Sequence, residues 1–132
     1  MSNLVSIIMP AHNSADTISM SIESVLKQTF HNWELIVIND NSTDDTDIII
    51  KNYAEKDSRI KYLETERSFC KPFYPRNIGI EYAKGRFIAF LDSDDIWLPT
   101  KLEHQIPLLE TYNVVVVFSY YFKMNYTGIM QN

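Results

Sequence analysis

The repeated change of hydrophobic period along the chain is the feature that most constrains its fold. Short apolar runs of strand length alternate with longer segments whose apolar residues recur at helical spacing. The predicted strands cover residues 4–9, 34–38, 59–63, 86–91 and 114–118. The segments between them are long enough for the helical crossovers that parallel strands require. The sequence therefore predicts an α/β fold, a Rossmann-like, open and mostly parallel sheet of about five strands with helices on both faces.

Proline and glycine mark the ends of several predicted helices. Pro75 stands where a first helical turn tolerates proline, and Gly85 is a natural stop for the same helix. Pro99 opens the last helix, and Pro107 lies inside it, where a proline can cost about 3 kcal/mol. We therefore expect a kink or an early end of that helix at Pro107.

Composition and charge exclude several classes of protein. A chain of 132 residues that is 45% hydrophobic and 22% charged is typical of one globular domain, here residues 1–132. The net charge of −5 argues against a nucleic-acid partner, because phosphate binding needs a basic face. The single cysteine, Cys70, cannot form an internal disulfide, which favours a reducing setting. Since neither a signal peptide nor an apolar run of roughly 20 residues stands out, we expect a cytoplasmic protein, peripheral to a membrane at most.

Polar side chains follow three of the predicted strands, at the point where each strand ends. Residues 10–13 follow the first strand, residues 39–45 the second and residues 92–95 the fourth. Ligands of open α/β sheets bind outside the carboxyl ends of the strands. We therefore expect these segments to form one binding site, although each alone also fits a structural role such as a helix cap.

The segment Asp92-Ser93-Asp94-Asp95 is the strongest local indication of a ligand. Three carboxylates within four residues repel one another by roughly 1 to 4 kcal/mol per close pair. A hard cation would relieve this repulsion, and carboxylate oxygens suit Mg²⁺ or Mn²⁺. Such an ion could bridge a diphosphate and stabilise the charge that develops as it leaves. An acidic turn before a helix is the alternative that needs no ion.

Four further residues are candidates for ligand contacts, three after predicted strands and one at the start of a helix. Asp40 ends an apolar strand, where a carboxylate can accept from a base or a ribose hydroxyl, or cap the next helix. His12 is expected to be a hydrogen-bonding group at the rim, and Asn13 either shares that role or caps its helix. Arg76 opens the third helix, where the helix dipole and the guanidinium both favour a diphosphate, or it is merely solvated.

Taken together, five segments resemble the family 2 glycosyltransferases, whose fold is usually called GT-A. These segments are residues 5–10 with Asn13, residues 24–30 with 33–35, residues 40–46, residues 76–79 and residues 85–95. The resemblance runs from about Val5 to Ser119 and is carried by the order of the motifs, since each motif alone is weak. It implies the nucleotide-sugar-binding half of such an enzyme.

The resemblance also assigns roles to individual residues. The loop Pro10 to Asn13, His12 included, would hold the nucleotide base and ribose together with Asp40, and Arg76 would lie near the base or the diphosphate. The acidic segment would hold the rest of the donor and the metal, with Asp92 and Ser93 contacting ribose and phosphate. Asp94 would coordinate Mn²⁺ or Mg²⁺ as the last member of the Asp-x-Asp motif, with Asp92 as a second ligand. Asp95 would support the turn.

The family transfers a sugar from a nucleotide diphosphate sugar to an acceptor hydroxyl with inversion, often in polysaccharide biosynthesis. The resemblance favours a uridine-type donor and a saccharide or lipid-linked acceptor. It places the general base in an acceptor-binding half beyond Asn132, so we expect a truncated chain that is inactive alone. The sequence departs from the family at Asn39, where many members have aspartate, at Asn41, where many have glycine, and in the aromatic loop 67–74, which is often glycine-rich.

Other functions stay open on the sequence. A non-catalytic nucleotide-sugar-binding or assembly subunit is compatible with the short chain. The short chain is also compatible with a homo-oligomer. A nucleotidyltransferase usually carries a glycine-rich, basic loop after its first strand, which Pro10-Ala11-His12-Asn13 does not provide. A phosphoacceptor signalling domain places its acidic pair after the first strand and a lysine after the fifth, and neither is found here.

Overall fold

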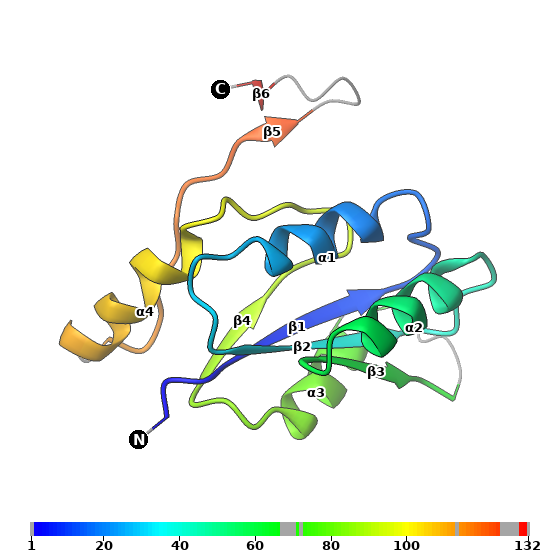
Figure 1. The fold of residues 1–132 in the computed structure, drawn as a ribbon, viewed down its shortest axis with the longest axis horizontal. Coiled ribbons are helices and arrows are strands. Elements are labelled where there is room, and N and C mark those ends of the chain that lie inside the picture. Colours follow the sequence, from blue (N-terminus) through cyan, green and yellow to red (C-terminus); the bar gives the residue numbers. More distant parts are fainter. Residues whose placement is uncertain (1, 67–70, 72, 113, 125–129, 132) are drawn as a thin grey trace.

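A parallel four-stranded sheet forms the centre of the molecule (Figure 1). The computed structural model describes residues 2–66, 71, 73–112, 114–124 and 130–131. The strands of this sheet lie in the order β3-β2-β1-β4 and comprise β1 (Val5–Ala11), β2 (Trp33–Asn39), β3 (Ile60–Glu64) and β4 (Phe87–Phe90). The predicted α/β class with a parallel sheet is therefore confirmed.

The register of the sheet brings the carboxyl ends of its strands together. Ala11, the last residue of β1, pairs with Asn39 of β2, which pairs in turn with Glu64 of β3. All seven residues of β2 are buried, as expected for a strand with a neighbour on each side and helices above and below. Any loop that follows β1, β2 or β3 consequently begins at the same edge of the sheet.

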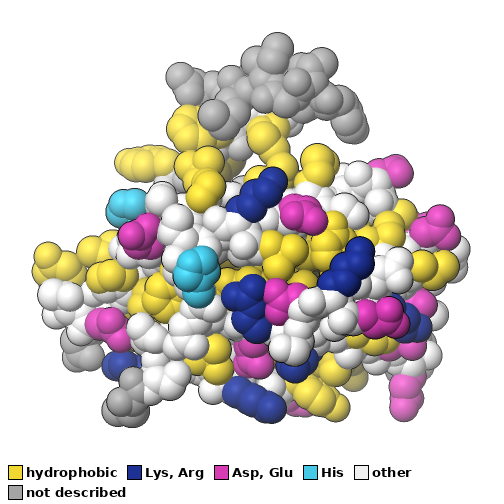
Figure 2. Space-filling view, in the orientation of Figure 1, with side chains coloured by type: hydrophobic (Ala, Val, Ile, Leu, Met, Phe, Trp, Pro, Cys, Tyr) yellow, Lys and Arg dark blue, Asp and Glu magenta, His cyan; other side chains and the backbone are white. Residues whose placement is uncertain are grey.

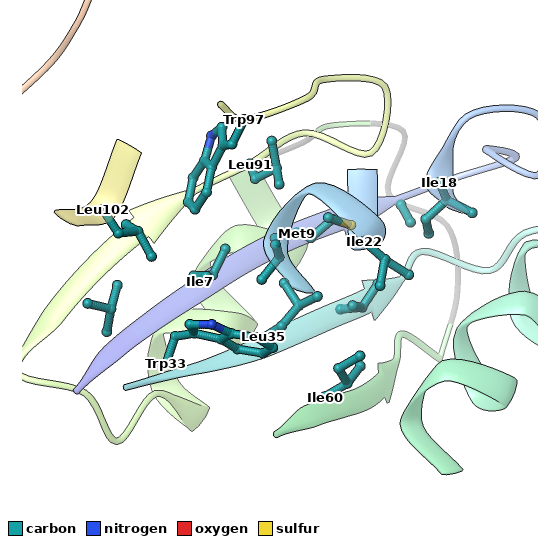
Figure 3. Packing of buried hydrophobic residues seen from close by; sticks show 14 of the residues in the cluster. Ile7, Met9, Ile18, Ile22, Trp33, Leu35, Ile60, Leu91, Trp97 and Leu102 are labelled. Atoms are coloured by element: carbon teal, nitrogen blue, oxygen red, sulfur yellow. The ribbon is translucent and has the colours of Figure 1, made fainter. Parts of the chain in front are cut away.

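Three helices contribute to the larger core on one face of the sheet. They are α1 (Ile18–Leu26), α2 (Thr46–Lys56) and α4 (Lys101–Tyr112). Figure 3 shows Ile22 of α1 and Leu102 of α4 among side chains of this core, which also includes Ile7 of β1 and Ile50 of α2. The helical spacing of apolar residues in the sequence thus corresponds to faces that the helices bury against the strands.

The helix α3 (Phe73–Tyr82) covers the opposite face, against Ile8, Ile36 and Ile38. Gly79 permits this close packing, because a Cβ there would lie 2.6 Å from Cγ2 of Ile8 and 2.9 Å from Cδ1 of Ile38. Helices therefore lie on both faces of the sheet, as predicted.

The predicted fifth strand at residues 114–118 is wrong. The described residues 114–122 form no strand, and the next strand, β5 (Lys123–Met124), pairs with β6 (Met130–Gln131) outside the main sheet. Val115 and Phe118 are 92% and 90% exposed. Hydrophobic side chains also gather in the upper part of the face that Figure 2 shows. A run of β-branched residues supplies strand propensity but not a pairing partner, so the main sheet has four strands.

The last helix of the sequence prediction, α4, does not show the early end that was one of the two outcomes expected at Pro107. Pro107 lies inside α4, which continues past it to Tyr112, so the helix does not end early.

Part of the aromatic loop 67–74, residues 67–70 and 72, lies outside the described residues. Among the helices that the structure describes, none has the length and apolarity to cross a membrane.

Candidate functional site

The loops after β1 and β2 are joined directly beyond the last paired residues of the two strands. The backbone N–H of Asp40 donates to the carbonyl of Ala11 at 2.7 Å, and Nδ1 of His12 lies 2.8 Å from the carbonyl oxygen of Asp40. His12 itself is exposed at the rim. Pro10 differs slightly from its prediction, because it is still part of β1, opposite Ile38, and is only partly buried.

The carboxylate of Asp40 is buried, with 4% of the residue exposed. Its Oδ1 accepts a hydrogen bond from the Thr65 hydroxyl at 2.8 Å, and the backbone N–H of Thr65 donates to the carbonyl of Asn39 at 3.0 Å. Thr65 directly follows β3, so a third strand end contributes to the site. Sequence reasoning missed Thr65, although its place after the third predicted strand was a usable signal. Because α2 begins after Asp45, Asp40 does not occupy the cap position that the alternative role requires.

Asn13 links the two loops rather than capping α1. Its backbone N–H donates to Oγ of Ser42 at 3.0 Å, and its Oδ1 accepts from the backbone N–H of Thr43 at 2.8 Å. Asn13 and Asn41 have φ values of 46° and 53°, in the left-handed region that asparagine tolerates better than most residues. Two strained turns thus hold each other in place beside Asp40.

The segment after β4 is joined to the loop after β1 by hydroxyl groups. Oγ of Ser14 lies 2.7 Å from Oγ of Ser93, and the Thr17 hydroxyl donates to the Ser93 carbonyl at 2.9 Å. Ser93 is buried, with 8% exposed. The sequence singled out Ser93 but not Ser14 or Thr17 as its partners, because a contact between residues so far apart along the chain leaves no local pattern. The end of β4 therefore lies beside the end of β1.

The acidic segment brings three carboxylates close together. Asp92, Asp94 and Asp95 each offer an oxygen within 4.8 Å of the others. Desolvation raises the pKa of Asp95, and the charges of Asp94 and then Asp92 raise it further. The backbone N–H of Asp95 also donates to the carbonyl of Asp92 at 3.1 Å, which closes a turn. Clustered carboxylate oxygens that repel one another suit a hard divalent cation, so these residues fit Mn²⁺ or Mg²⁺.

Arg76 reaches the acidic segment from the other face of the sheet. It lies in the first turn of α3, and its Nη2 is 2.5 Å from Oδ1 of Asp92. The two side chains are 30% and 46% exposed, so the ion pair stays accessible to solvent and to a ligand. The structure thus gathers the predicted residues His12, Asn13, Asp40, Arg76 and Ser93 with the acidic segment around the carboxyl ends of the strands.

The chain matches known proteins over nearly its whole length. Residues 6–132 match the model of a family described as Glycosyl transferase family 2. The chain is 48% identical over 128 residues to UDP-Glc:alpha-D-GlcNAc-diphosphoundecaprenol beta-1,3-glucosyltransferase WfgD of Escherichia coli. That match covers 96% of this chain and 49% of WfgD, so the chain spans about half the length of this relative.

Two solved structures share the fold. Residues 1–349 of S. aureus TarS, in complex with UDP-GlcNAc, align with a TM-score of 0.77 at 32% identity, over 83% of this chain and 32% of that one. The mannosyltransferase PcManGT from Pyrobaculum calidifontis, in complex with GDP-Man and Mn²⁺, aligns with a TM-score of 0.65 at 24% identity, over 70% of this chain and 28% of that one. The latter is a likeness of fold alone.

Proposed function

The chain belongs to glycosyl transferase family 2, and we propose that residues 1–132 form the nucleotide-sugar-binding domain of an inverting glycosyltransferase. One observation carries this proposal, namely the convergence of polar groups that follow all four strands of the main sheet. Asp40 and Thr65 come from the ends of β2 and β3, Asn13 follows β1, and the acidic segment follows β4. A single ligand with a base, a ribose and a diphosphate could contact each of these groups at once.

The base and ribose would bind beside Asp40. A carboxylate can accept about four hydrogen bonds, so Asp40 can keep the Thr65 hydroxyl and still accept from a base N–H or a ribose hydroxyl. His12 and Asn13, with Pro10 behind them, would line the same part of the site. A uridine-type donor is supported by the structure of TarS, which is described in complex with UDP-GlcNAc.

The diphosphate would bind toward the acidic segment. We place the metal at Asp94 and Asp92, with Ser93 and Asp92 near the ribose and phosphate and Arg76 near the diphosphate. When bound, Mn²⁺ or Mg²⁺ would offset the charge of the leaving diphosphate. Arg76 would then orient Asp92 through their ion pair and add a second positive charge on the same side.

The acceptor and the general base are assigned to the remainder of a longer protein. The chain spans about half of WfgD, whose name describes a lipid-linked acceptor. We infer that the acceptor of the complete enzyme is a saccharide, and a lipid-linked one by analogy with WfgD. We propose that the groups of the chemical step come from the part that corresponds to the rest of WfgD.

Calorimetry of UDP binding tests the proposed function. We expect the chain to bind UDP more tightly with Mn²⁺ than with EDTA, because the acidic segment would hold the ion and the ion would offset the charge of the diphosphate. Asp94→Asn should abolish the difference while the far-UV circular dichroism stays unchanged. A matched control is Asp16→Asn, another exposed aspartate outside the acidic segment. Absence of UDP binding by the unmodified chain would refute the proposal, and metal-enhanced binding by Asp94→Asn would remove Asp94 as the ligand.

A further inference from the structure

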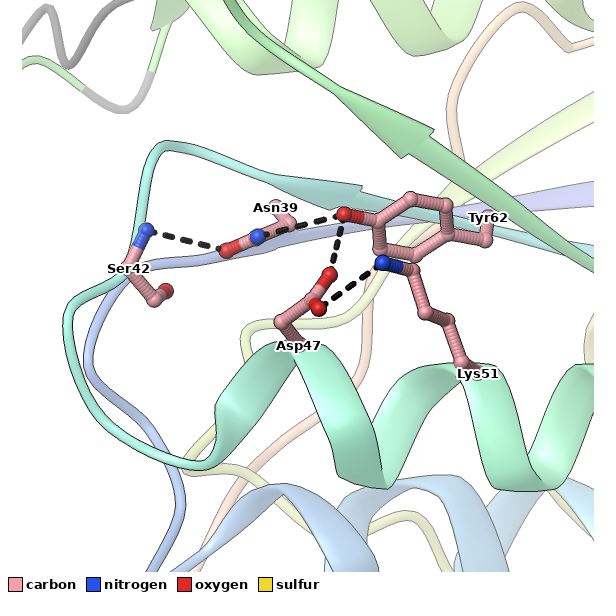
Figure 4. Close-up of polar contacts among 5 residues, drawn as sticks. All are labelled: Asn39, Ser42, Asp47, Lys51 and Tyr62. Atoms are coloured by element: carbon pink, nitrogen blue, oxygen red, sulfur yellow. Dashed lines mark hydrogen bonds and ion pairs between the residues drawn. The ribbon is translucent and has the colours of Figure 1, made fainter.

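A polar network behind the binding loops runs from α2 to the end of β2 (Figure 4). The Tyr62 hydroxyl of β3 donates to Oδ1 of Asp47 and accepts from Nδ2 of Asn39 at 3.3 Å. The other oxygen of Asp47, Oδ2, pairs with Nζ of Lys51 at 2.8 Å. On its loop side, Asn39 Oδ1 accepts from the backbone N–H of Ser42 at 3.2 Å.

The protonation states give this network a single direction. Hydrogen bonding from Lys51, followed by that from Tyr62, lowers the pKa of Asp47, so its carboxylate is ionised at neutral pH and can only accept. Burial, followed by the hydrogen bond to Asp47, raises the pKa of Tyr62 to about 12. The hydroxyl therefore keeps its proton at neutral pH and donates it in the hydrogen bond to Asp47. The Tyr62 oxygen can then only accept from Asn39. The Asn39 amide must therefore turn Nδ2 toward Tyr62 and Oδ1 toward Ser42.

The orientation of the Asn39 amide affects the binding loops through its hydrogen bond with Ser42. Ser42 accepts from the backbone of Asn13, whose Oδ1 in turn accepts from the backbone of Thr43. These contacts hold the two left-handed turns at Asn13 and Asn41 against each other. Asn39 is itself 1% exposed and directly precedes Asp40, so a rotation of its amide would break the contact that starts the loop.

We propose that Tyr62, oriented by Asp47, is a positioning residue that fixes the Asn39 amide and thereby the nucleotide-binding loop 40–43. Tyr62 would act through Asn39 and would not touch the nucleotide. The inference rests on the proposed function for its effect on affinity, but the effect on the loop stands independently of any ligand.

Tyr62→Phe is the direct test, and the chain offers a matched control. Tyr53 of α2 is also half-buried and donates to a carboxylate, Oε1 of Glu23 at 3.0 Å, away from the binding loops. We expect Tyr62→Phe to weaken UDP binding about fivefold, the effect of losing one typical hydrogen bond. Tyr53→Phe should leave UDP affinity unchanged although it loses a bond of the same kind. Equal affinities of the two variants would overturn the proposal.

A charge exchange provides a second test, which stays informative if Tyr62→Phe folds poorly. Asn39→Asp places a second carboxylate, besides that of Asp47, against the Tyr62 hydroxyl. Because this hydroxyl can donate only one hydrogen bond, one carboxylate loses its donor, and UDP affinity should fall. Combining Asn39→Asp with Asp47→Asn reverses the direction of the network, because Tyr62 can donate to position 39 and accept from position 47. We expect the double variant to recover most of the lost affinity. A double variant that binds no better than Asn39→Asp would contradict the proposal.

Hydrogen exchange separates this inference from the proposed function. Amide exchange measured by NMR without ligand should be faster at Ser42 in Tyr62→Phe than in the unmodified chain, and unchanged at Ser42 in Tyr53→Phe. If the unmodified chain does not bind UDP, the proposed function fails while this measurement still tests the network. Unaltered exchange at Ser42 in Tyr62→Phe would overturn the positioning role even if UDP binds.

Discussion

At the scale of single residues, the buried carboxylate of Asp40 is expected to decide nucleotide affinity. Asp40→Ala removes an acceptor that Thr65 already orients at 2.8 Å. A hydrogen bond to a charged group contributes about 1.5 to 3 kcal/mol, which corresponds to about 10- to 150-fold in the dissociation constant. We expect UDP binding to weaken within this range, equally with Mn²⁺ and with EDTA, in a calorimetric titration.

The control for Asp40 lies at the other end of the sheet. Asp57 pairs with Nη2 of Arg59 at 2.7 Å just before β3 begins. Asp57→Ala should lower Tm through the lost ion pair but leave UDP affinity unchanged. Normal affinity of Asp40→Ala with a lowered Tm would mean that Asp40 has only a structural role.

Asp44 predicts a dependence of stability on pH. Hydrogen bonds from the Thr46 side chain above all, and from backbone groups, lower the pKa of Asp44 from its ordinary value of 3.8. A carboxylate whose pKa is lowered by folding stabilises the protein above its unfolded pKa, and this contribution is lost as the pH falls through the folded value. Asp44→Ala should therefore lower Tm at pH 7, and the difference from the unmodified chain should shrink below pH 3.8.

Thermal unfolding followed by circular dichroism from pH 7 downward measures this difference. Asp16→Ala serves as the control, since Asp16 is another exposed aspartate in a neighbouring loop. A Tm difference for Asp44→Ala that stays constant with pH would show that the lost contacts do not depend on the ionised carboxylate.

At the scale of elements, the approach of α3 to the sheet depends on Gly79. Alanine is favoured over glycine inside a helix by about 1 kcal/mol, so propensity alone predicts that Gly79→Ala stabilises. The added Cβ would however lie 2.6 Å from Ile8 and 2.9 Å from Ile38, and overpacking of a core typically costs about 1 to 3 kcal/mol. We expect the overlap to prevail and Tm to fall by several degrees.

Differential scanning calorimetry of Gly79→Ala and of Glu81→Ala would test this balance. Glu81 is exposed on the same helix, so its substitution changes propensity without touching the sheet. A Tm of Gly79→Ala at or above that of the unmodified chain would show that α3 can shift away from Ile8 without loss.

Hydrophobic period predicted most of these elements, because burial imposes it directly on the sequence. The four strands of the main sheet and the helices on both faces follow from it. It misled at residues 114–118, since an apolar run looks the same whether or not a neighbouring strand is there to pair with it. The prediction for Pro107 shows a similar limit, because local propensity did not end a helix whose Leu109, beyond the proline, still packs against the core.

The candidate site was predictable only in part. Side chains that follow strands can be named from the sequence, as Asp40 and Asp92 were, because strand ends share one edge of a parallel sheet. Their partners cannot, since the contacts of Ser14 with Ser93 and of Tyr62 with Asp47 join separate elements. The chemical roles of the named residues remain predictions for the binding experiments.

At the scale of the whole molecule, we expect the 132-residue chain to bind its donor without transferring sugar. An inverting displacement needs a general base near the acceptor hydroxyl, worth typically about 10²- to 10⁴-fold in rate, and an acceptor held in line, which can contribute more. We have assigned both to the part of a WfgD-like protein that this chain does not span. Product formation should be measured over a panel of saccharide acceptors with UDP-sugars and Mn²⁺.

A full-length protein of the same family serves as the positive control for that assay. Slow hydrolysis of the donor by the 132-residue chain is compatible with the assignment, because a bound metal would still assist the leaving group. Robust transfer to an acceptor would contradict it and would mean that these residues contain a base, with His12 and Asp95 the first to substitute.

The link between Ser14 and Ser93 has a consequence for how the protein is made. The two residues are 79 positions apart, so a ribosome that adds about 5 to 20 residues per second needs roughly 4 to 16 s between them. During that interval β1, β2 and β3 can already pair in sequence, since they are neighbours in the sheet, whereas β4 must still return to the free side of β1. The nascent chain would therefore bring Asp40 and Thr65 together first and acquire its acidic segment last. A nucleotide encountered early in synthesis could be held by its base before there is anything to hold its phosphates.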